Sequence, residues 1–342
     1  MFNSNLFLLH QSHELDVHVA RARAKKSNLN ARSEADAFAL SETKFIKRYR
    51  LSKSLAIQLI EELKPHLEPA RSRSDALTVE TKVLIALAFY ATGSYQTVVG
   101  DSRTHCVSQP SVSKAVREVT LALNKPDVMN KHLGFPFHRH EREQVKRDFY
   151  RAFRMPGVLG CIDGTHVAIV CPPRNEERFY NRKGYHSLNV LIMCDSQLNI
   201  MCVDASYPGS THDSVVWANH TLKTYTDNLH RVRGENIYFL GDSGYPLRPT
   251  MMTPILNPAS SAESHYNEVH IATRNVVERC IGVLKARFRC LLVDRKLHYS
   301  PATAAKIVNA CSVLHNIAHR ANVPYEPLTG EEARRERRLT SG

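Results

Sequence analysis

The stretch VLGCIDGTH, at residues 158–166, places a carboxylate inside an apolar run that predicts a β-strand. A second carboxylate, Asp242, directly follows another such run at residues 237–241, and a third, Glu278, lies in a segment with helical periodicity. A carboxylate in an apolar element is costly unless it has a partner, and a pair of divalent cations is one such partner. We therefore predict that Asp163, Asp242 and Glu278 are metal-binding, catalytic acids.

The elements between these acids set the predicted topology. Two apolar segments, at residues 188–194 and 200–207, flank the turn-like sequence DSQLN and predict a β-hairpin. A helix is expected over residues 213–222, and the strand at 237–241 then ends at Asp242. This order predicts an RNase H-like α/β core, in which a mixed sheet is flanked by helices. The first and fourth strands of that topology are neighbours, so both aspartates should face one crevice at the strand ends.

The segment that carries Glu278 predicts a helix with basic residues beside the acid. Its apolar positions repeat at helical spacing: Val277, Ile281, Leu284, Phe288 and Leu291. At about 100° per residue, Glu278 lies at the edge of this stripe, and Arg274 and Lys285 lie within roughly 40° of it. We predict that Glu278 is partly buried yet reaches a metal, and that Arg274 and Lys285 contact DNA phosphates.

Each acid taken alone has a structural alternative. Asp-Gly and Asp-Ser-Gly are common turn sequences, so Asp163 and Asp242 are alternatively turn residues, with Glu278 as surface charge. Asp213 opens the helix expected over residues 213–222, where a capping role is favoured over that of a carboxylate near the metals. The order of the three acids along the chain favours the catalytic interpretation.

The chain is basic, with 46 Lys and Arg residues against 33 Asp and Glu residues and a net charge of +13. This balance predicts an anionic partner, nucleic acid before membrane, although a basic surface that aids solubility would give the same balance. No apolar run is long enough to span a bilayer. The short apolar run at residues 5–9 lacks the basic leader of a signal peptide.

The eight cysteines are scattered and form no Cys-x-x-Cys pair. This spacing favours buried thiols in a reducing compartment over a disulfide framework or a zinc ribbon. Cys311, His315 and His319 share one face of a helix expected over residues 301–321. We interpret them as part of a packed core helix, because no fourth zinc ligand is evident.

The sequence divides into four parts. Residues 1–40 form a basic, weakly patterned tail, which suits either a nuclear-import or DNA-contacting arm or a solvated tail. Residues 41–135 are helical, residues 136–320 form the nuclease core, and residues 321–342 form a charged, solvated tail. Within the helical part, Ser52 is expected to cap a helix that Pro65 stops, and Gly93 to end a second helix over residues 78–92.

Residues 94–123 predict two short helices joined by a tight connection, with Ser108 as the N-cap of the second. The second helix has a buried apolar stripe made of Val112, Val116, Val119 and Leu123. Lys114 and Arg117 face outward, so the pattern is that of a helix-turn-helix whose second helix fits a major groove. We predict that Lys114 and Arg117 contact DNA; the alternative is an ordinary helical hairpin that supports the core.

Basic and aromatic side chains alternate between the first two predicted strands. Arg182 and Lys183 lie close to Tyr180 and Tyr185, a pattern that suits phosphate contact and base stacking. The acidic residues at 176–177 support the alternative of a solvated loop. We predict that Arg182 and Lys183 contact DNA.

Six segments read together resemble the transposases of the Harbinger (PIF/Harbinger) DNA transposons and the nucleases domesticated from them. They are ATGSYQ at 91–96, GCIDGTH at 160–166, NRKGYHSLN at 181–189, GSTHDS at 209–214, LGDSGY at 240–245 and LHN at 314–316. The resemblance runs from about residue 45 to 320, most of the chain. It implies a DDE superfamily endonuclease in which Asp163, Asp242 and Glu278 are the catalytic acids.

The resemblance also implies a mechanism and partners. Two Mg²⁺ or Mn²⁺ ions would activate a water for in-line attack on a DNA phosphodiester, with Asp163 bridging the ions and Asp242 and Glu278 each holding one. In this family a separate Myb-like protein often supplies DNA targeting and nuclear entry. The resemblance therefore implies a Myb-like partner and a nuclear location, with the cytoplasm as a second location.

A finer correspondence is incomplete, and two other functions stay open. Arg274 and Lys285 match an Arg and a Lys around the catalytic Glu of some related bacterial transposases, but the Tyr that precedes that Arg there is replaced by Ile271. One alternative function is a catalytically silent, domesticated DNA-binding protein that acts with a Myb-like partner. The other is a hydrolase of small phosphate esters, which predicts little affinity for DNA and weak salt dependence.

Overall fold

The structure is a computed structural model that describes residues 36–68, 76–101 and 105–340. Nearly all of the basic stretch predicted for residues 1–40 lies outside the described residues, and its last part forms the short 3-10 helix η1 (Ala37–Ala39). In the described part of the chain, no helix is both long and apolar enough to cross a membrane.

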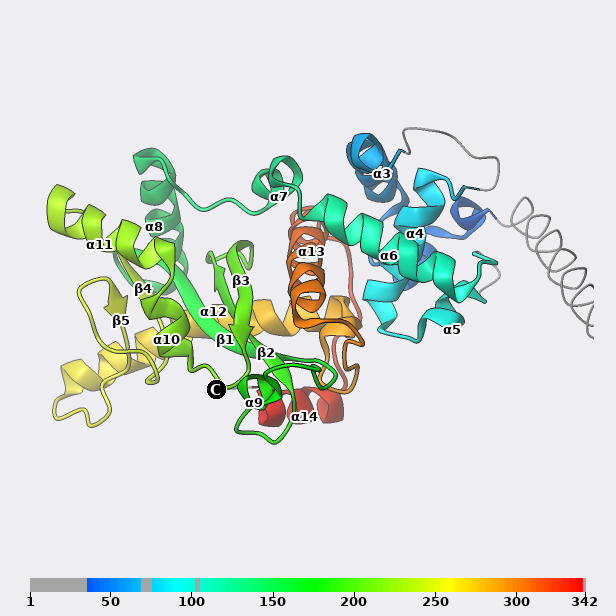
Figure 1. Cartoon of the computed structure of the whole chain (residues 1–342). Helices are drawn as coiled ribbons and strands as arrows, with labels where there is room; N and C mark the ends of the chain where they lie inside the picture. The colour runs from blue at the N-terminus through cyan, green and yellow to red at the C-terminus, as the bar shows by residue number, and fades with distance from the viewer. Residues whose placement is uncertain (1–35, 69–75, 102–104, 341–342) are drawn as a thin grey trace, which may run out of the picture.

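A five-stranded mixed sheet forms the centre of the α/β core (Figure 1). Its strands, in the order β3-β2-β1-β4-β5, are β3 (Ile200–Pro208), β2 (Ser187–Cys194), β1 (Val158–Ala168), β4 (Tyr238–Leu240) and β5 (Met251–Met252). The hairpin of β2 and β3 is antiparallel, β1 pairs with β2 antiparallel, and β1 pairs with β4 parallel. The α/β fold and the adjacency of the first and fourth strands are thus confirmed, whereas β5 was not foreseen.

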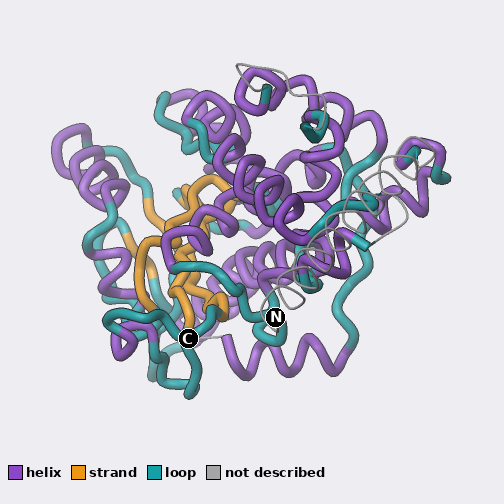
Figure 2. Tube along the Cα trace, turned by 45° about the vertical axis from the view of Figure 1, so that its right-hand side comes forward, coloured by secondary structure: helices purple, strands orange, loops and turns teal. Residues whose placement is uncertain are grey.

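Helices cover both faces of this sheet, as Figure 2 shows. Side chains alternate along β1, so Cys161 packs with α12 (Ser261–Arg287) and α13 (Pro301–Arg320), while Ile162 packs with Trp217 of α10 (Asp213–Ala218). Phe149 of α8 (Arg139–Phe153) belongs to the first of these cores, and Leu229 of α11 (Thr221–Arg233) to the second. The sheet is therefore buried on both faces, in agreement with the apolar runs of β1 and β2.

One helix expected over residues 213–222 is in fact two. α10 ends at Ala218, and His220 starts α11 by accepting a hydrogen bond on Nδ1 from the amide of Leu222, 3.2 Å away. The prediction of a single helix was wrong because His220 caps a second helix. Helical periodicity in the sequence does not reveal such a break between two helices.

Six helices make up the region before the core. They are α2 (Glu42–Tyr49), α3 (Lys53–Leu67), α4 (Val79–Thr92), α5 (Gln96–Gly100), α6 (Gln109–Leu123) and α7 (Pro126–His132). Ser52 caps α3, because its Oγ accepts a hydrogen bond from the amide of Leu55 at 3.2 Å. Gly93 ends α4 in the left-handed conformation, with φ of 61°. Both predictions are confirmed.

Pro65 lies inside α3 and does not stop it, contrary to the prediction. A proline removes only its own backbone donor, and the helix closes its last turn with a hydrogen bond from the amide of Glu68 to the carbonyl of Lys64, 3.0 Å long. α3 therefore continues to Leu67.

The predicted stripe of α6 is buried in full: Val112, Val116, Val119 and Leu123. Ser108 occupies the N-cap position, but its hydroxyl lies 3.0 Å from that of Ser111 and does not accept a hydrogen bond from a backbone amide. Residues of this helical region and of α12 and α13 belong to one continuous hydrophobic cluster. Figure 1 shows the helical region at one end of the molecule and α11 at the other.

The solvated tail predicted for residues 321–342 is instead largely the helix α14 (Gly330–Thr340). It packs against the core near β1, and its Glu336 is buried. The high charge of this segment predicted exposure to solvent and gave no sign that one face of the helix packs against the core. Two short elements complete the chain: α9 (Glu176–Phe179) and the 3-10 helix η2 (Arg289–Leu291).

Candidate active site

The parallel pairing of β1 with β4 brings the two aspartates together. Cys161 on β1 is the register partner of Leu240 on β4, and Asp163 and Asp242 each follow two residues later. Asp163 points to the same face of the sheet as Cys161, whose thiol donates to the carbonyl of Thr273 on α12 at 3.5 Å. Asp163, in the middle of β1, therefore lies beside the carboxyl end of β4, where Asp242 follows, and both aspartates lie beneath α12.

Glu278 completes the group from α12. Asp163, Asp242 and Glu278 line one cavity of about 760 Å³. The helix stripe that positions Glu278 is buried at Val277 and Leu284, and Ile281 is partly buried. Glu278 itself is half exposed, with 49% of its side chain accessible. α12 ends at Arg287, so the last two residues of the predicted stripe, Phe288 and Leu291, lie just beyond the helix.

Arg274 joins two of the three acids. Its Nη2 lies 3.0 Å from Oδ2 of Asp163, and its Nη1 pairs with Oε1 of Glu278 one helical turn away. Only 16% of the Arg274 side chain is exposed. The guanidinium thus serves as the resident counter-charge of the site in this structure, although it was predicted to contact a DNA phosphate.

The site carries more negative charge than Arg274 neutralises. Burial raises the pKa of Asp163 to about 7; Arg274 opposes this rise, and the nearby carboxylates of Asp242, Asp213 and Glu278 add to it. A carboxyl group with so high a pKa holds a proton that a stronger counter-charge would displace. The electrostatics of the cluster therefore favour an added cation.

The donor atoms of the three acids fit a hard divalent cation. All are carboxylate oxygens, the ligands that Mg²⁺ and Mn²⁺ prefer. Backbone amides orient two of the acids, since Oδ1 of Asp163 accepts from the amide of Gly164 and Oδ1 of Asp242 accepts from the amide of Gly244, each at 3.0 Å. The turn alternative thus applies to Asp242, which lies in the turn after β4, and not to Asp163, which lies within β1. Both carboxylates nevertheless line one cavity with Glu278.

The three acids are not drawn tightly together, however. Among the described residues, the ligand atoms of only one group of three lie within 4.8 Å of one another, and that group is Cys171, Glu176 and His186. Asp163, Asp242 and Glu278 are spread more widely, with the Arg274 guanidinium between the first and the last. A cation held by Asp163 and Glu278 together would take the place that this guanidinium fills.

Asp213 is a fourth carboxylate at the site, and its predicted capping role was wrong. The N-cap of α10 is His212, and Asp213 is the first residue of the helix. Its Oδ1 accepts a hydrogen bond from Nδ2 of Asn189 on β2, at 2.5 Å. A Cβ atom added to Gly164 would lie only 2.2 Å from this Oδ1, so Asp213 packs directly on the backbone next to Asp163. The sequence GSTHDS, which includes Asp213, was the available signal.

The predicted DNA contacts fall into two classes. Lys114, Arg117, Arg182 and Lys183 are exposed, as a phosphate contact requires. Lys285 is 1% exposed, and its Nζ donates to Oε1 of Glu336 at 2.7 Å and to the carbonyl of His166 at 3.0 Å. Lys285 thus lies out of reach of DNA in this structure, contrary to the prediction, because α14 covers it. Burial lowers its pKa, while Glu336 opposes that shift.

The cysteine and histidine predictions hold in part. All eight cysteines are free thiols, but Cys171 is exposed where a buried thiol was expected. On α13, Nε2 of His315 bonds to the carbonyl of Leu198 at 3.0 Å, and Nε2 of His319 bonds to that of Gln197 at 2.6 Å. The predicted packed core helix is therefore confirmed at this position.

Comparison with known proteins identifies the family. The family model for the DDE superfamily endonucleases matches residues 162–316, a span that includes Asp163, Asp242 and Glu278. The Homo sapiens protein named "Putative nuclease HARBI1" is 38% identical over 286 residues, which are 82% of this chain and 80% of that protein. The chain belongs to the DDE superfamily of endonucleases, in the group of Harbinger-derived nucleases. The resemblance seen in the sequence and the prediction of a nuclease are thereby confirmed.

Two further relatives of this DDE endonuclease extend the comparison. HARBI1 of Xenopus laevis is 38% identical over 261 residues, covering 76% of this chain and 73% of that protein. The Arabidopsis thaliana protein named "Protein ALP1-like" is 25% identical over 265 residues, covering 72% of this chain and 62% of that protein. No solved structure matches the chain.

Proposed function

We propose that this chain is a metal-dependent DNA endonuclease that hydrolyses phosphodiester bonds at Asp163, Asp242 and Glu278. The observation that carries the proposal is the convergence of these acids, from β1, the end of β4 and α12, on one cavity, where burial and the neighbouring carboxylates raise the pKa of Asp163. The basic chain, with its net charge of +13, supports a polyanionic substrate over a small phosphate ester.

The cofactor in this proposal is a pair of Mg²⁺ or Mn²⁺ ions. Asp163, Asp242 and Glu278 would hold these ions through their carboxylate oxygens. When bound, such ions supply a water of lowered pKa and stabilise the leaving oxygen. Arg274 holds Asp163 and Glu278 in place beforehand, and once these acids take a cation it is free to pair with a phosphate. Asp213 fixes the β1 backbone at Gly164, so it acts as a positioning residue.

The partners and the location of the protein also belong to the proposal. The nuclear location, with the cytoplasm as a second location, and a Myb-like partner for DNA targeting are supported only by the Harbinger resemblance. Lys114, Arg117, Arg182 and Lys183 are the proposed DNA contacts, and their exposure supports this role.

Nicking of supercoiled plasmid tests the proposal. The purified protein is incubated with and without Mn²⁺ beside Asp163→Asn and Glu278→Gln variants. Glu268→Gln serves as the matched control, because Glu268 is an exposed glutamate on the same helix, outside the cavity. We expect nicking that requires metal, is lost in both site variants and persists in the control.

The opposite result is equally informative. Absence of nicking in every sample, together with tight, salt-sensitive DNA binding, would replace the nuclease by the catalytically silent DNA-binding protein. That conclusion would require that a Myb-like partner, when added, does not restore cleavage. Absence of both nicking and DNA binding would favour a small phosphate ester as substrate.

A further inference from the structure

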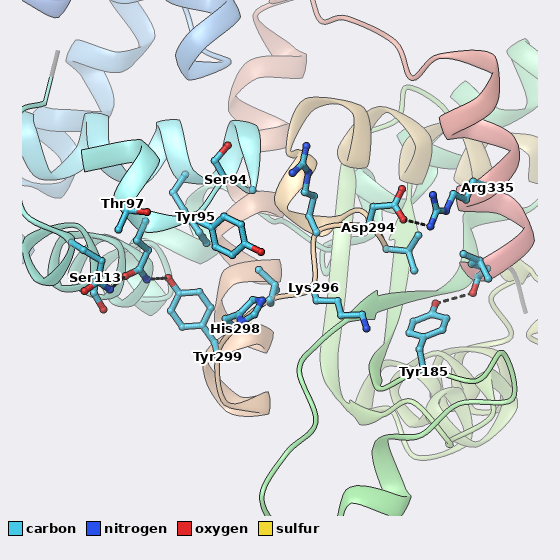
Figure 3. A pocket seen from close by; sticks show the side chains of 18 residues that line it. Ser94, Tyr95, Thr97, Ser113, Tyr185, Asp294, Lys296, His298, Tyr299 and Arg335 are labelled. Carbon is cyan, nitrogen blue, oxygen red and sulfur yellow. Dashed lines mark hydrogen bonds and ion pairs between the residues drawn. The ribbon is translucent and has the colours of Figure 1, made fainter. Parts of the chain in front are cut away.

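A second cavity, of about 900 Å³, lies between the helical region and the nuclease core (Figure 3). One wall comes from the turn after α4, from α5 and from the start of α6, and includes Tyr95 and Ser113. The other comes from residues 293–299, from Tyr185 and from α14. None of the three catalytic acids lines this cavity, so it is distinct from the proposed active site.

The lining of this cavity is positively charged. Arg295 and Lys296 are exposed, and neither has an ion-pair partner within the described part of the chain. Asp294, the one acidic residue of the lining, is neutralised by Arg335, whose Nη2 lies 2.9 Å from its Oδ1. Figure 3 shows Lys296 extending between His298 and Tyr185. Two unpaired cations therefore face the cavity, and such a pair suits an anionic ligand.

The position of Arg295 is fixed by the fold. A Cβ atom added to Gly93 would lie 3.1 Å from Cβ and 3.2 Å from Cγ of Arg295, so the stem of Arg295 packs on the glycine that ends α4. Gly93 has φ of 61°, which favours glycine. Because the aliphatic part of Arg295 is held by this packing, the side chain loses less conformational entropy when its guanidinium binds a ligand.

Aromatic and hydroxyl groups surround these cations. Tyr95 is 73% exposed, which is high for so large a ring, and its ring centroid lies 6.2 Å from that of His298 at a steep angle. Ser94, Thr97 and Ser113 add hydroxyl groups to the same wall. Cations, hydroxyl donors and an exposed ring are the side chains that contact phosphates and sugars in protein–DNA interfaces.

A chain of hydrogen bonds ties the two walls together. Nε2 of Gln109 on α6 donates to Oε1 of Gln96 on α5 at 2.5 Å, and Nε2 of Gln96 donates to the hydroxyl of Tyr299 at 2.7 Å. Tyr299 in turn packs edge-on against Phe89 of α4, with ring centroids 5.8 Å apart. The cavity is therefore already formed in this structure, with its two walls joined by these contacts.

We infer that this cavity binds the sugar–phosphate backbone of DNA, with Arg295 and Lys296 as its phosphate contacts. The inference rests on the proposed DNA endonuclease function and adds a surface that the sequence did not reveal. Ser113 adjoins Lys114 on α6, and Tyr185 lies two residues after Lys183. The cavity thus connects the two groups of exposed cations already proposed to contact DNA, which favours an extended polyanion over a compact ligand.

DNA binding without metal tests this inference separately from cleavage. Fluorescence anisotropy of a labelled duplex is measured over a salt series in the Asp163→Asn background, with and without Arg295→Ala/Lys296→Ala. We expect the double variant to bind on the order of tenfold more weakly at about 100 mM salt, with a salt slope shallower by about two. Arg231→Ala/Arg233→Ala removes the same charge from the end of α11, away from the cavity, and should change affinity much less.

A third variant should act in the opposite direction. Asp294→Asn removes the acidic group of the lining and frees Arg335, so we expect DNA to bind a few-fold more tightly. Equal affinity and equal salt slope in the Arg295→Ala/Lys296→Ala and control variants would overturn the inference. Binding of an acidic peptide to the cavity, together with an unchanged DNA affinity in the Arg295→Ala/Lys296→Ala variant, would also overturn the inference.

The two proposals can fail independently. If the wild-type protein nicks DNA, and Arg295→Ala/Lys296→Ala leaves both nicking in the wild-type background and DNA binding in the Asp163→Asn background unchanged, the endonuclease proposal holds and the cavity inference is wrong. If the wild-type protein does not nick DNA but Arg295→Ala/Lys296→Ala lowers DNA affinity, the cavity inference holds and the proposed endonuclease activity is wrong.

Discussion

At the residue scale, the absence of a side chain at Gly164 allows Asp213 to pack next to Asp163 in the proposed active site. Gly164 follows Asp163 on β1, and the carboxylate of Asp213 occupies the space that any side chain at residue 164 would need. This close approach lets Asp213 keep its hydrogen bond to Asn189 while it adds negative charge next to Asp163. Glycine at this position is thus required by packing and not by an unusual φ.

The variant Gly164→Ala tests this requirement. The new Cβ would displace the Asp213 carboxylate, so we expect nicking to be lost and the free energy of unfolding to fall by about 1–3 kcal/mol. Plasmid nicking and urea unfolding measure the two effects. Gly134→Ala is the control, because no atom lies within 4 Å of a Cβ added there, and it should leave both quantities nearly unchanged. Full activity of Gly164→Ala would show that Asp213 does not position the site.

At the scale of elements, an ion pair joins α8 to the turn between α11 and β4. Nε of Arg142 donates to Oε2 of Glu235 at 2.9 Å, and Nη2 donates to Oε1 at 2.7 Å. Only 1% of the Arg142 side chain and 9% of the Glu235 side chain are exposed. The hydrogen bonds from Arg142 lower the pKa of Glu235, with burial opposing and the charge of Arg142 assisting. This pair fixes the segment that leads into β4 and so to Asp242.

The lowered pKa gives this pair a pH signature. Its stabilisation is complete above the unfolded-state pKa of a glutamate, about 4.3, and is lost as the pH falls through the lower folded-state pKa. We expect Glu235→Gln to lower the free energy of unfolding by about 2 kcal/mol at pH 7, and by progressively less below pH of about 4. Urea unfolding across this pH range measures the difference.

Glu143→Gln provides the comparison for the ion-pair variant. Glu143 pairs with Lys146 on the same helix, but 39% of its side chain is exposed. Its loss should cost no more than about 0.5 kcal/mol at any pH. A Glu235→Gln effect that stays constant with pH would show that the pair contributes by packing alone.

Elements with a strong apolar period were predictable from the sequence, and elements defined by a distant partner were not. β1, β2, β3 and α6 follow their residue patterns because burial alone selects them. The two-residue strand β5 exists only because β4 lies beside it. α14 likewise owes its position to Lys285, an ion-pair partner far away in the sequence.

The candidate site shows the same division. The order of strands and helices fitted an RNase H-like topology, and that topology predicted that β1, which carries Asp163, lies next to β4, which Asp242 follows. The roles of Arg274 and Lys285 were not predictable from a helical wheel. A wheel gives the direction of each side chain but not the Asp163 or Glu336 carboxylate that it meets.

At the scale of the whole molecule, one hydrophobic cluster extends from α2 through α4 and α6 to α12 and α13. The helical region and the nuclease core therefore share their interior. Because neither part can lose its packing without exposing the other, the two should unfold together.

Two spectroscopic probes test this cooperativity. Trp217, the single tryptophan, is part of α10 and lies in the other core, whereas far-ultraviolet circular dichroism reports all the helices. We expect the two urea-unfolding curves to coincide, and Val119→Ala in α6 to shift both to lower urea equally, by a destabilisation of about 1–3 kcal/mol. A circular dichroism change that precedes the tryptophan change would show that the helical region unfolds by itself.

The parallel pairing of β1 with β4 also has a consequence for biosynthesis. A ribosome that has translated the chain through residue 242 has added Asp163 and Asp242, but Glu278 and its helix are still to be made. At roughly 5–20 residues per second, the acids therefore emerge seconds apart. A truncated or half-made product lacks a complete set of acids, so on the proposed mechanism the ability to cut a genome is acquired only late in translation.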